Sequence, residues 1–421
     1  MRDSLADSYY AATANRQRQP SPLAGDVSCD VAIIGGGFTG VAAALACAEK
    51  GFSVVLLEAE TIGFGASGRN GGQLIPGLRW SMREMEAEFG KDRAKAIFDV
   101  AWGARDRVWS RVARHKIDCD LTSGHLEAAY KPAHLDDMAA EADLLDTRFG
   151  YKTTILDRAG LSEHIHADGY HGGLYDLQGG HFHPLNYVRG LAVAAEEAGV
   201  QIFENRRVTE VIDQGAVTVR TAHGTVRAAH AILATDAWME EIDPGLARFT
   251  IPIMNYNVAT APLPNADALL PSNAAVADSR FVLNYFRLSA DKRLLFGGGE
   301  KYVQTPPADI AGFVRRHIIE VFPQLASTPI DYQWGGAVSV SMNRLPILGR
   351  RGNVFHAFGF SGHGALVTTL AGELIAEALA GTASRFDVMA SLPKRPFPGG
   401  KWMRRPLATL GLLWYALKDR L

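Results

Sequence analysis

The stretch that decides the fold lies between residues 30 and 58 and opens with Asp30-Val31-Ala32-Ile33-Ile34-Gly35-Gly36-Gly37-Phe38-Thr39-Gly40. The apolar run before Gly35 is short and rich in β-branched residues, as is typical of a buried parallel strand. Gly35, Gly37 and Gly40 then have the spacing of a dinucleotide-binding turn. In such a turn the glycines permit a tight bend, a close approach of pyrophosphate to the backbone, and close packing of helix on sheet.

The residues after this turn complete the same unit. Residues 41–48 carry small side chains suited to close helix packing, and Val54–Leu57 form a second apolar run that ends in Glu58. An acid at that place can accept hydrogen bonds from ribose hydroxyls and disfavours a 2′-phosphate. An ordinary glycine-rich turn is the alternative, but strand, glycines, helix, strand and acid all agree. FAD and NAD both fit this unit.

Composition excludes several classes of protein. The chain has 421 residues and a net charge of −2, so it is long enough for two or three domains and carries no strong field for nucleic acid. Cys29, Cys47 and Cys119 lack metal-binding spacing and indicate reduced thiols in a cytoplasmic protein. We expect no secretory signal, no membrane span and no bound metal.

A second glycine-rich segment follows Glu58. Residues 63–73 read Gly63-Phe64-Gly65-Ala66-Ser67-Gly68-Arg69-Asn70-Gly71-Gly72-Gln73. Glycines at this density let a backbone bend sharply and approach a ligand closely. The interleaved polar side chains add hydrogen-bonding groups, and Arg69 adds a cation for phosphate or flavin oxygens. The alternative is a flexible surface loop.

The rest of the chain indicates a second domain. Residues 93–115 have the apolar spacing of one amphipathic helix, and residues 250–340 alternate strand-like runs with a helix near 307–322. We therefore predict an α/β FAD-binding domain, Rossmann-like with a parallel sheet, and an α+β substrate domain built on an antiparallel sheet. The expected division is 1–80, 184–249 and 345–421 for the first domain, and 81–183 and 250–344 for the second.

Candidate substrate residues lie in that second domain. Its aromatic and polar side chains could together face the cofactor, whereas any one of them alone would be ordinary packing or surface. The candidates are Tyr256, Tyr285, Arg287, Trp334 and Arg344. His181 and His183 have an H-x-H spacing that could suggest a metal, but no third ligand is evident, so structural or substrate-lining histidines are the better interpretation.

The segment near residue 360 favours FAD over NAD. A strand enters a glycine-rich turn at residues 359–364, and residues 366–380 continue as a helix. A helix N-terminus aimed at a flavin would stabilise negative charge on the reduced ring. The tail from residue 401 to 421 mixes leucines with Arg404 and Arg405. It could contact a membrane surface weakly, although docking on the protein itself is the favoured alternative.

These motifs, in this order, closely resemble the D-amino-acid oxidase superfamily of FAD-dependent amine oxidoreductases. Within it, the resemblance is strongest to members that oxidise gamma-glutamylputrescine, through residues 8–15, 65–73 and 414–417. The resemblance places His363 at the isoalloxazine, which makes it the first candidate for tuning the flavin or the amine. Lys301 is a candidate for assisting oxygen, and a solvated surface lysine is the favoured alternative. The resemblance also implies cofactor contacts by Gly35, Gly37, Phe38, Thr39, Gly40, Glu58, Ala59, Ala66, Ser67, Arg69, Asn70, Gly71, Gly72, Gln73, Val208, Ala234, Thr235, Gly359, Phe360, Ser361, Gly362, His363 and Gly364.

The resemblance further implies noncovalent FAD, because residues 339–343 lack the cysteine that links flavin in some relatives. Many relatives carry Asp where this chain has Asn343. The expected reaction is oxidation of a small-molecule amine by hydride transfer to flavin N5, giving an imine that hydrolyses to an aldehyde. Oxygen or a quinone would reoxidise the flavin, with oxygen the first expectation. The alternatives are oxidation of L-pipecolate, L-proline or a D-amino acid, and a flavin-binding protein without turnover.

Overall fold

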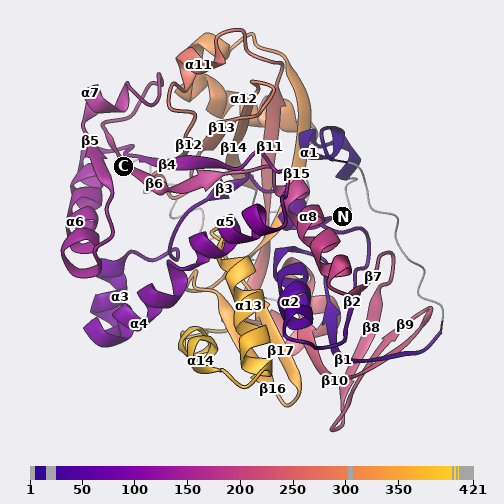
Figure 1. The fold of residues 1–421 in the computed structure, drawn as a ribbon. Coiled ribbons are helices and arrows are strands. Elements are labelled where there is room, and N and C mark those ends of the chain that lie inside the picture. Colours follow the sequence, from indigo (N-terminus) through magenta and orange to yellow (C-terminus); the bar gives the residue numbers. More distant parts are fainter. Residues whose placement is uncertain (1–4, 16–24, 302–306, 401–402, 404–405, 407–421) are drawn as a thin grey trace.

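The computed structural model describes residues 5–15, 25–301, 307–400, 403 and 406. Figure 1 shows two sheets, one in the lower half of the view and one in the upper half, each with its own helices. Within the described residues, no helix combines the length and the apolar character needed to cross a membrane. The expected tail contacts, including Arg404 and Arg405, lie outside the described residues.

The first sheet has a parallel centre. Its strand order is β16-β17-β10-β1-β2-β7, and β7, β2, β1, β10 and β17 run parallel to their neighbours. Strands β8, β9 and β16 pair antiparallel at its margins. The strands are β1 (Val27–Ile34), β2 (Val54–Leu57), β7 (Gln201–Phe203), β8 (Val208–Asp213), β9 (Val217–Thr221), β10 (Gly224–Leu233), β16 (Ile347–Arg351) and β17 (Val354–Phe358).

Small residues let helices pack tightly on this sheet. Helices α2 (Phe38–Glu49), α8 (Pro184–Glu197) and α13 (Val367–Leu379) contact one another in one layer. At Gly372 a Cβ atom would lie 2.6 Å from the backbone nitrogen of Ala43, so α13 can approach α2 this closely only without a side chain there. This arrangement confirms the predicted α/β unit.

The second sheet is almost wholly antiparallel. Its order is β15-β11-β14-β13-β12-β4-β6-β3, with β5 paired to β6 and one parallel pair, β12 with β4. The strands are β3 (Gln73–Leu74), β4 (Thr122–Ala128), β5 (Thr154–Leu156), β6 (Gly173–His181), β11 (Thr250–Thr260), β12 (Ala275–Asp278), β13 (Tyr285–Leu288), β14 (Leu294–Lys301) and β15 (Ile330–Ser341). Helix α12 (Ile310–Val321) packs on β11 and β14, as an α+β domain requires.

Further helices surround the two sheets. The α-helices are α1 (Tyr9–Ala12), α3 (Met82–Phe89), α4 (Lys91–Ala101), α5 (Ala104–Arg114), α6 (Pro132–Phe149), α7 (Arg158–Leu161), α9 (Met239–Ile242), α10 (Pro244–Ala247), α11 (Ala266–Leu269) and α14 (Ser384–Ala390). The 3-10 helices are η1 (Leu5–Asp7), η2 (Ala66–Gly68), η3 (Asp236–Trp238) and η4 (Pro323–Leu325).

One local expectation was wrong. Residues 93–115 form two helices, because α4 ends at Ala101 and α5 begins at Ala104. Gly103 is a poor helix former, and the Trp102 ring covers Gly77 in place of continuing the helical stripe. In the N-terminal segment, α1 buries Tyr10 against Trp334 of the second sheet.

The sheets agree with the predicted fold class, but the exact division of the chain stays a proposal. Strands of the first sheet come from residues 27–57, 201–233 and 347–358. Strands of the second come from residues 73–74, 122–181 and 250–341. The segment 63–73 therefore lies on the connection between β2 of the first sheet and β3 of the second sheet, and it ends where β3 begins.

Candidate functional site

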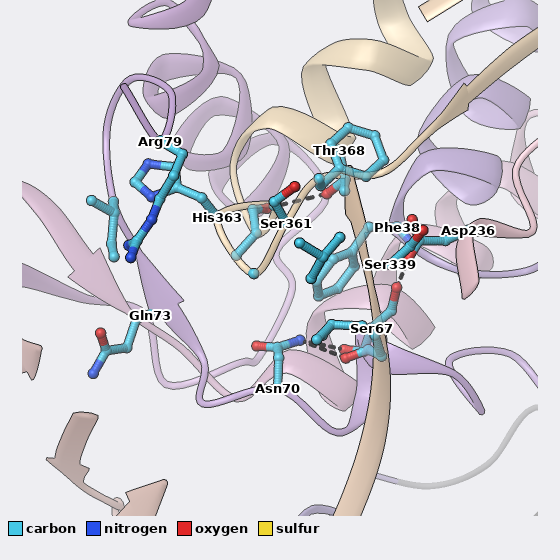
Figure 2. A pocket seen from close by; sticks show the side chains of 18 of the residues that line it. Phe38, Ser67, Asn70, Gln73, Arg79, Asp236, Ser339, Ser361, His363 and Thr368 are labelled. Atoms are coloured by element: carbon cyan, nitrogen blue, oxygen red, sulfur yellow. Dashed lines mark hydrogen bonds between the residues drawn. The ribbon is translucent and has the colours of Figure 1, made fainter. Parts of the chain in front are cut away.

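One cavity of about 820 Å³ is lined by both sheets. This volume lies within the usual range for pockets that bind small molecules and cofactors, roughly 300–1,000 Å³. Its wall includes the glycine turn after β1, the segment 64–73, the end of β10 and the turn before α13. Figure 2 shows side chains from these elements around the same space.

The glycine turn has no room for side chains. Gly35 has a φ of +110°, and a Cβ there would lie 2.6 Å from the carbonyl oxygen of Ala234. A Cβ on Gly40 would lie 1.9 Å from the oxygen of Gly35. Gly37 is the N-cap of α2, and the amide of Phe38 next to it donates to Ser67 Oγ at 2.9 Å. The turn thus presents bare backbone and a helix N-terminus to the cavity, which suits a pyrophosphate.

Glu58 lies at the end of β2, on the same wall. Its Oε2 accepts from the Gly36 amide at 2.6 Å and its Oε1 accepts from the Glu60 amide at 2.9 Å. A carboxylate has about four acceptor positions, so two remain for hydroxyl groups. Burial raises the pKa of Glu58, while the hydrogen bonds that its carboxylate accepts from the two backbone amides oppose that rise. Together with the glycine turn, this arrangement fits the adenosine and pyrophosphate half of FAD.

The segment 63–73 is held in shape by its own side chains. Asn70 Nδ2 donates to the carbonyls of Ala66 and Ser67, both at 3.0 Å, and Asn70 Oδ1 accepts from the Gly72 amide at 2.8 Å. Gln73 Nε2 donates to the Val276 carbonyl at 2.7 Å, which ties the segment to β12. These bonds fix a backbone that lines the cavity.

Arg69 does not line the cavity, in contrast to the expected role as a cation for phosphate or flavin. Its buried guanidinium donates to the carbonyl of Phe64 at 2.7 Å and to that of Gly335 at 3.0 Å. In turn, Trp334 Nε1 donates to the Arg69 carbonyl at 2.9 Å. Arg69 therefore fastens the segment 63–73 to β15 of the second sheet.

The turn before α13 adopts a conformation that few residues accept. Gly359, Ser361 and Gly362 all have positive φ, and Ser361 is the rare non-glycine among them with a φ of 57°. Asp236 accepts from the Gly359 amide at 2.9 Å, and the Ser361 amide donates to the Ser339 carbonyl at 3.0 Å. Strain that the surroundings hold in place is common at functional sites.

His363 follows this turn and lines the cavity (Figure 2). Its Nε2 is buried without a hydrogen-bond partner. Burial, together with the nearby charge of Arg79, lowers the pKa of His363 from 6.5 to about 3. The imidazole is therefore neutral at physiological pH.

The predicted substrate residues divide into two groups. Tyr285 and Arg344 line the cavity: the Tyr285 hydroxyl donates to Asn255 and the Arg344 guanidinium lies 3.9 Å from the Phe281 ring centroid. The other three do not line it. Lys301 is the last residue of β14. Its side chain lies outside what the structure describes.

Packing and hydrogen bonds explain why three of the predicted substrate residues do not line the cavity. Tyr256 is fully buried against Phe313 of α12. Trp334 donates to Arg69, as described above. Arg287 donates to the carbonyls of Gly71 at 2.9 Å and Phe182 at 2.8 Å, so this cation supports the loop beneath the cavity instead of facing it.

Most predicted cofactor residues do meet on one wall. The cavity is lined by Gly35, Gly37, Phe38, Thr39, Glu58, Ala59, Ala66, Ser67, Asn70, Gly71, Gln73, Val208, Ala234, Thr235, Phe360, Ser361, Gly362, His363 and Gly364. Gly40, Arg69, Gly72 and Gly359 are not among the lining residues. Gly40 and Gly359 still shape the two turns, and their roles as direct contacts stay a prediction.

The histidine pair at 181 and 183 is structural. His183 caps α8, where its Nδ1 accepts from the Asn186 amide at 3.1 Å. His181 Nε2 lies 2.8 Å from the Asn273 carbonyl oxygen. Among the described residues, no group of three or more His, Cys, Asp and Glu side chains could hold a metal ion.

Sequence reasoning missed many polar residues of the wall, among them Arg79, His125, Glu127 and Asp236. Asp236 had a signal, because it ends the apolar run of β10 as acids often do at ligand-binding strand ends. Arg79, His125 and Glu127 had none. His125 and Glu127 lie on β4 and Arg79 follows β3, and these two strands flank β6 in the second sheet.

Comparison with known proteins identifies the family. The model of the FAD dependent oxidoreductase (DAO) family matches residues 30–378. The chain is 39% identical over 419 residues to the gamma-glutamylputrescine oxidoreductase of Escherichia coli (strain K12), which covers 98% of each chain. It is 36% identical over 422 residues to the probable oxidoreductase OrdL of Haemophilus influenzae, covering 98% of this chain and 97% of that one.

A solved structure shows the same fold. The glycine oxidase of Geobacillus kaustophilus superposes with a TM-score of 0.70 at 22% identity, over 84% of this chain and 95% of that one. The family match, the full-length relatives and a cavity that fits the cofactor agree. The chain therefore belongs to the D-amino-acid oxidase (DAO) family of FAD-dependent oxidoreductases.

Proposed function

We propose that this enzyme oxidises the primary amine of gamma-glutamylputrescine, giving an imine that hydrolyses to an aldehyde. The observation that carries the proposal is one continuous cavity, which is lined both by the dinucleotide-binding glycines and by Tyr285 and Arg344. A substrate there would lie against the cofactor. The relative of that name, identical at 39% of positions over the whole length, supports this substrate before others.

Bound noncovalently, FAD supplies an acceptor for two electrons from the amine. The chain's own residues hold and orient the reactants. The glycine turn and Glu58 hold the adenosine end, and the strained turn at 359–364 brings backbone amides and His363 to the other end. Because His363 is neutral, it can accept a hydrogen bond there without adding a positive charge that would repel an amine.

Oxidation of an imino acid such as L-proline or L-pipecolate, or of a D-amino acid, is the second candidate. A carboxylate-binding arginine on the cavity wall would favour it, and Arg344 is on the wall. Arg287 gives this candidate no support, since its donors are taken by backbone carbonyls. A flavin-binding protein without turnover has less support still, because the cavity is not closed by bulky side chains.

An anaerobic titration of the purified yellow protein tests the proposal. The panel contains gamma-glutamylputrescine, putrescine, glycine, sarcosine, D-alanine, L-proline and L-pipecolate, and the readout is loss of the flavin band at roughly 450 nm. Fast bleaching by gamma-glutamylputrescine is the expected result. Bleaching by an imino or amino acid alone would overturn the substrate.

Two further readings follow from the same sample. Admitting air separates an oxidase, which recovers its colour and forms peroxide, from an enzyme that needs a quinone. We expect the oxidase. Denaturation should release all flavin into solution, because none of the three cysteines lines the cavity. Flavin that stays with the precipitated chain would contradict noncovalent binding.

A further inference from the structure

Part of the cavity wall is formed by residues outside the cofactor motifs, and we call the space beside this part of the wall the second compartment. This compartment is walled by Arg79, by α3, by α6 and by strands β4 and β6. Its lining is partly apolar, through Leu78, Trp102, Leu145 and Leu174. Two charged side chains of opposite sign, Arg79 and Glu127, also face it.

Most charged side chains on the cavity wall are already paired. Glu60 binds Arg207 at 2.9 Å, Asp176 accepts from the Tyr151 hydroxyl at 2.7 Å, and Glu141 accepts from the Met82 amide at 2.6 Å. Arg280 lies between Asp278 and Glu320. Within the described residues, Arg79 and Glu127 differ from these, because the structure shows neither a hydrogen bond nor an ion pair for either side chain.

Glu127 is exposed to the cavity and yet surrounded by protein. Loss of bulk water raises the pKa of its carboxyl, and the charge of Arg79 partly opposes that rise. Arg79 also acts on His363, beside which it is drawn in Figure 2. Arg79 thus lies within electrostatic reach of both the flavin-side histidine and the carboxylate at the far wall.

Opposite charges with restricted access to bulk water are costly when no hydrogen bond or ion pair satisfies them, and the long-range attraction between Arg79 and Glu127 offsets only part of that cost. A ligand that carries both signs on one carbon would satisfy them together. We propose that Arg79 and Glu127 bind the zwitterionic α-amino acid head of the substrate, the carboxylate at Arg79 and the ammonium at Glu127. This inference rests on the proposed function, in which the other end of the same molecule is the amine that is oxidised.

The pair also accounts for selectivity. Free putrescine would place a second ammonium near Arg79, which repels it, and would leave Arg79 without a partner. A glutamyl head removes both penalties. The enzyme is then expected to prefer amines that end in an α-amino acid over diamines of similar length.

The first test uses a ligand that cannot be oxidised at its far end. Gamma-glutamylethylamide carries the glutamyl head but no terminal amine. Calorimetric titration of the FAD-loaded enzyme should detect its binding, and Arg79→Gln and Glu127→Gln should each weaken it about tenfold or more, the usual cost of one charge-assisted hydrogen bond. Glu84→Gln is the matched control, because Glu84 also lines the cavity but is already bonded to Ser81 at 2.8 Å.

The second test separates head binding from action on the reacting amine. N-acetylputrescine keeps the terminal amine and lacks the α-amino acid. Both variants should raise KM for gamma-glutamylputrescine about tenfold or more while KM for N-acetylputrescine and flavin content stay unchanged. An equal rise for both substrates would place Glu127 at the reacting amine and overturn the inference.

The outcomes distinguish the two proposals. If no amine reduces the flavin but both variants still bind gamma-glutamylethylamide more weakly than the parent enzyme, the proposed function fails and the head-binding site stands. If gamma-glutamylputrescine reduces the flavin and both variants bind the ethylamide like the parent enzyme, the proposed function stands and the head-binding site is wrong.

Discussion

The amide of Gly36 donates to the carboxylate of Glu58 at 2.6 Å, so the glycine turn after β1 and the acid after β2 are bonded directly. The acid that could receive the ribose therefore also fixes the turn that could receive the pyrophosphate. Changes at one of these positions are expected to disturb the other.

Replacing Glu58 by Ala should lower FAD retention sharply. The variant loses a hydrogen-bond acceptor for the ribose and leaves the Gly36 and Glu60 amides without partners, a loss of about 1–3 kcal/mol. The measurement is the ratio of flavin to protein after gel filtration at dilute concentration. Glu60→Gln is the control, since the carboxylate of Glu60 pairs with Arg207 nearer the surface. An unchanged flavin ratio in Glu58→Ala would remove this residue from the cofactor site.

Replacing Arg69 by Met should also lower FAD retention, for a different reason. The variant leaves buried carbonyls of Phe64 and Gly335 without donors, and we expect a loss of stability of about 2–4 kcal/mol. Thermal unfolding of the FAD-loaded protein measures it. Arg83→Met on the surface of α3 removes a similar side chain from an exposed ion pair and should change little. A midpoint equal to that of the parent protein would show that the segment 63–73 does not depend on Arg69.

Replacing His363 by Asn should slow anaerobic flavin bleaching by about tenfold, which corresponds to one lost hydrogen bond. Because burial holds the pKa of His363 near 3, the imidazole does not titrate between pH 6 and pH 10. The pH at half-maximal rate should therefore be the same in both proteins. A shift of that pH would mean that His363 titrates in the working range, and an unaltered rate would remove it from the mechanism.

Asp236 gives the protein a stability term that depends on pH. Burial raises the pKa of this carboxyl from 3.8 to about 6, so the folded state holds the proton more tightly than the unfolded state. The resulting stabilisation is fully present below about pH 4 and is lost as pH rises through 6, and it amounts to about 3 kcal/mol. Asp236→Asn does not titrate, so the free energy of unfolding of the variant relative to the parent should rise by that amount between pH 4 and pH 8.

Urea unfolding of both FAD-loaded proteins at the two pH values checks this. The exposed Asp7→Asn variant serves as control for a general effect of removing one carboxyl. A difference between Asp236→Asn and the parent that stays constant with pH would contradict the protonation of Asp236 in the folded protein.

The nucleotide-binding unit was predictable because its causes are local. Strand, glycines, helix and acid lie within residues 30–58, and each glycine has a steric reason that the sequence pattern already carries. The glycine-rich turn at residues 359–364 was predictable for the same reason. Its conformation needs positive φ at Gly359 and Gly362, and glycine is the residue that adopts it freely.

The far wall was not predictable, because strand register and loop packing decide it. Tyr285 and Arg287 lie two residues apart on β13 and so point to one face, yet only Tyr285 lines the cavity. The segment 69–73 passes over Arg287, and its backbone accepts a hydrogen bond from the guanidinium. Conversely, the pairing of β4, β6 and β3 brings Arg79 and Glu127 to the same cavity. No spacing in the sequence predicts this pairing.

The segment 63–73 begins beside the first sheet and ends as β3 of the second, and the compartment that holds Arg79 and Glu127 lies beyond it. If this compartment binds the substrate head as proposed, changes at Arg79 and on α3, α6, β4 and β6 should alter the choice of amine. A library that varies the positions around Glu127 would leave the glycine turns and Glu58 untouched, so its members should keep their yellow colour while their substrates diverge. Colour would then report an intact scaffold, and turnover would report the new specificity.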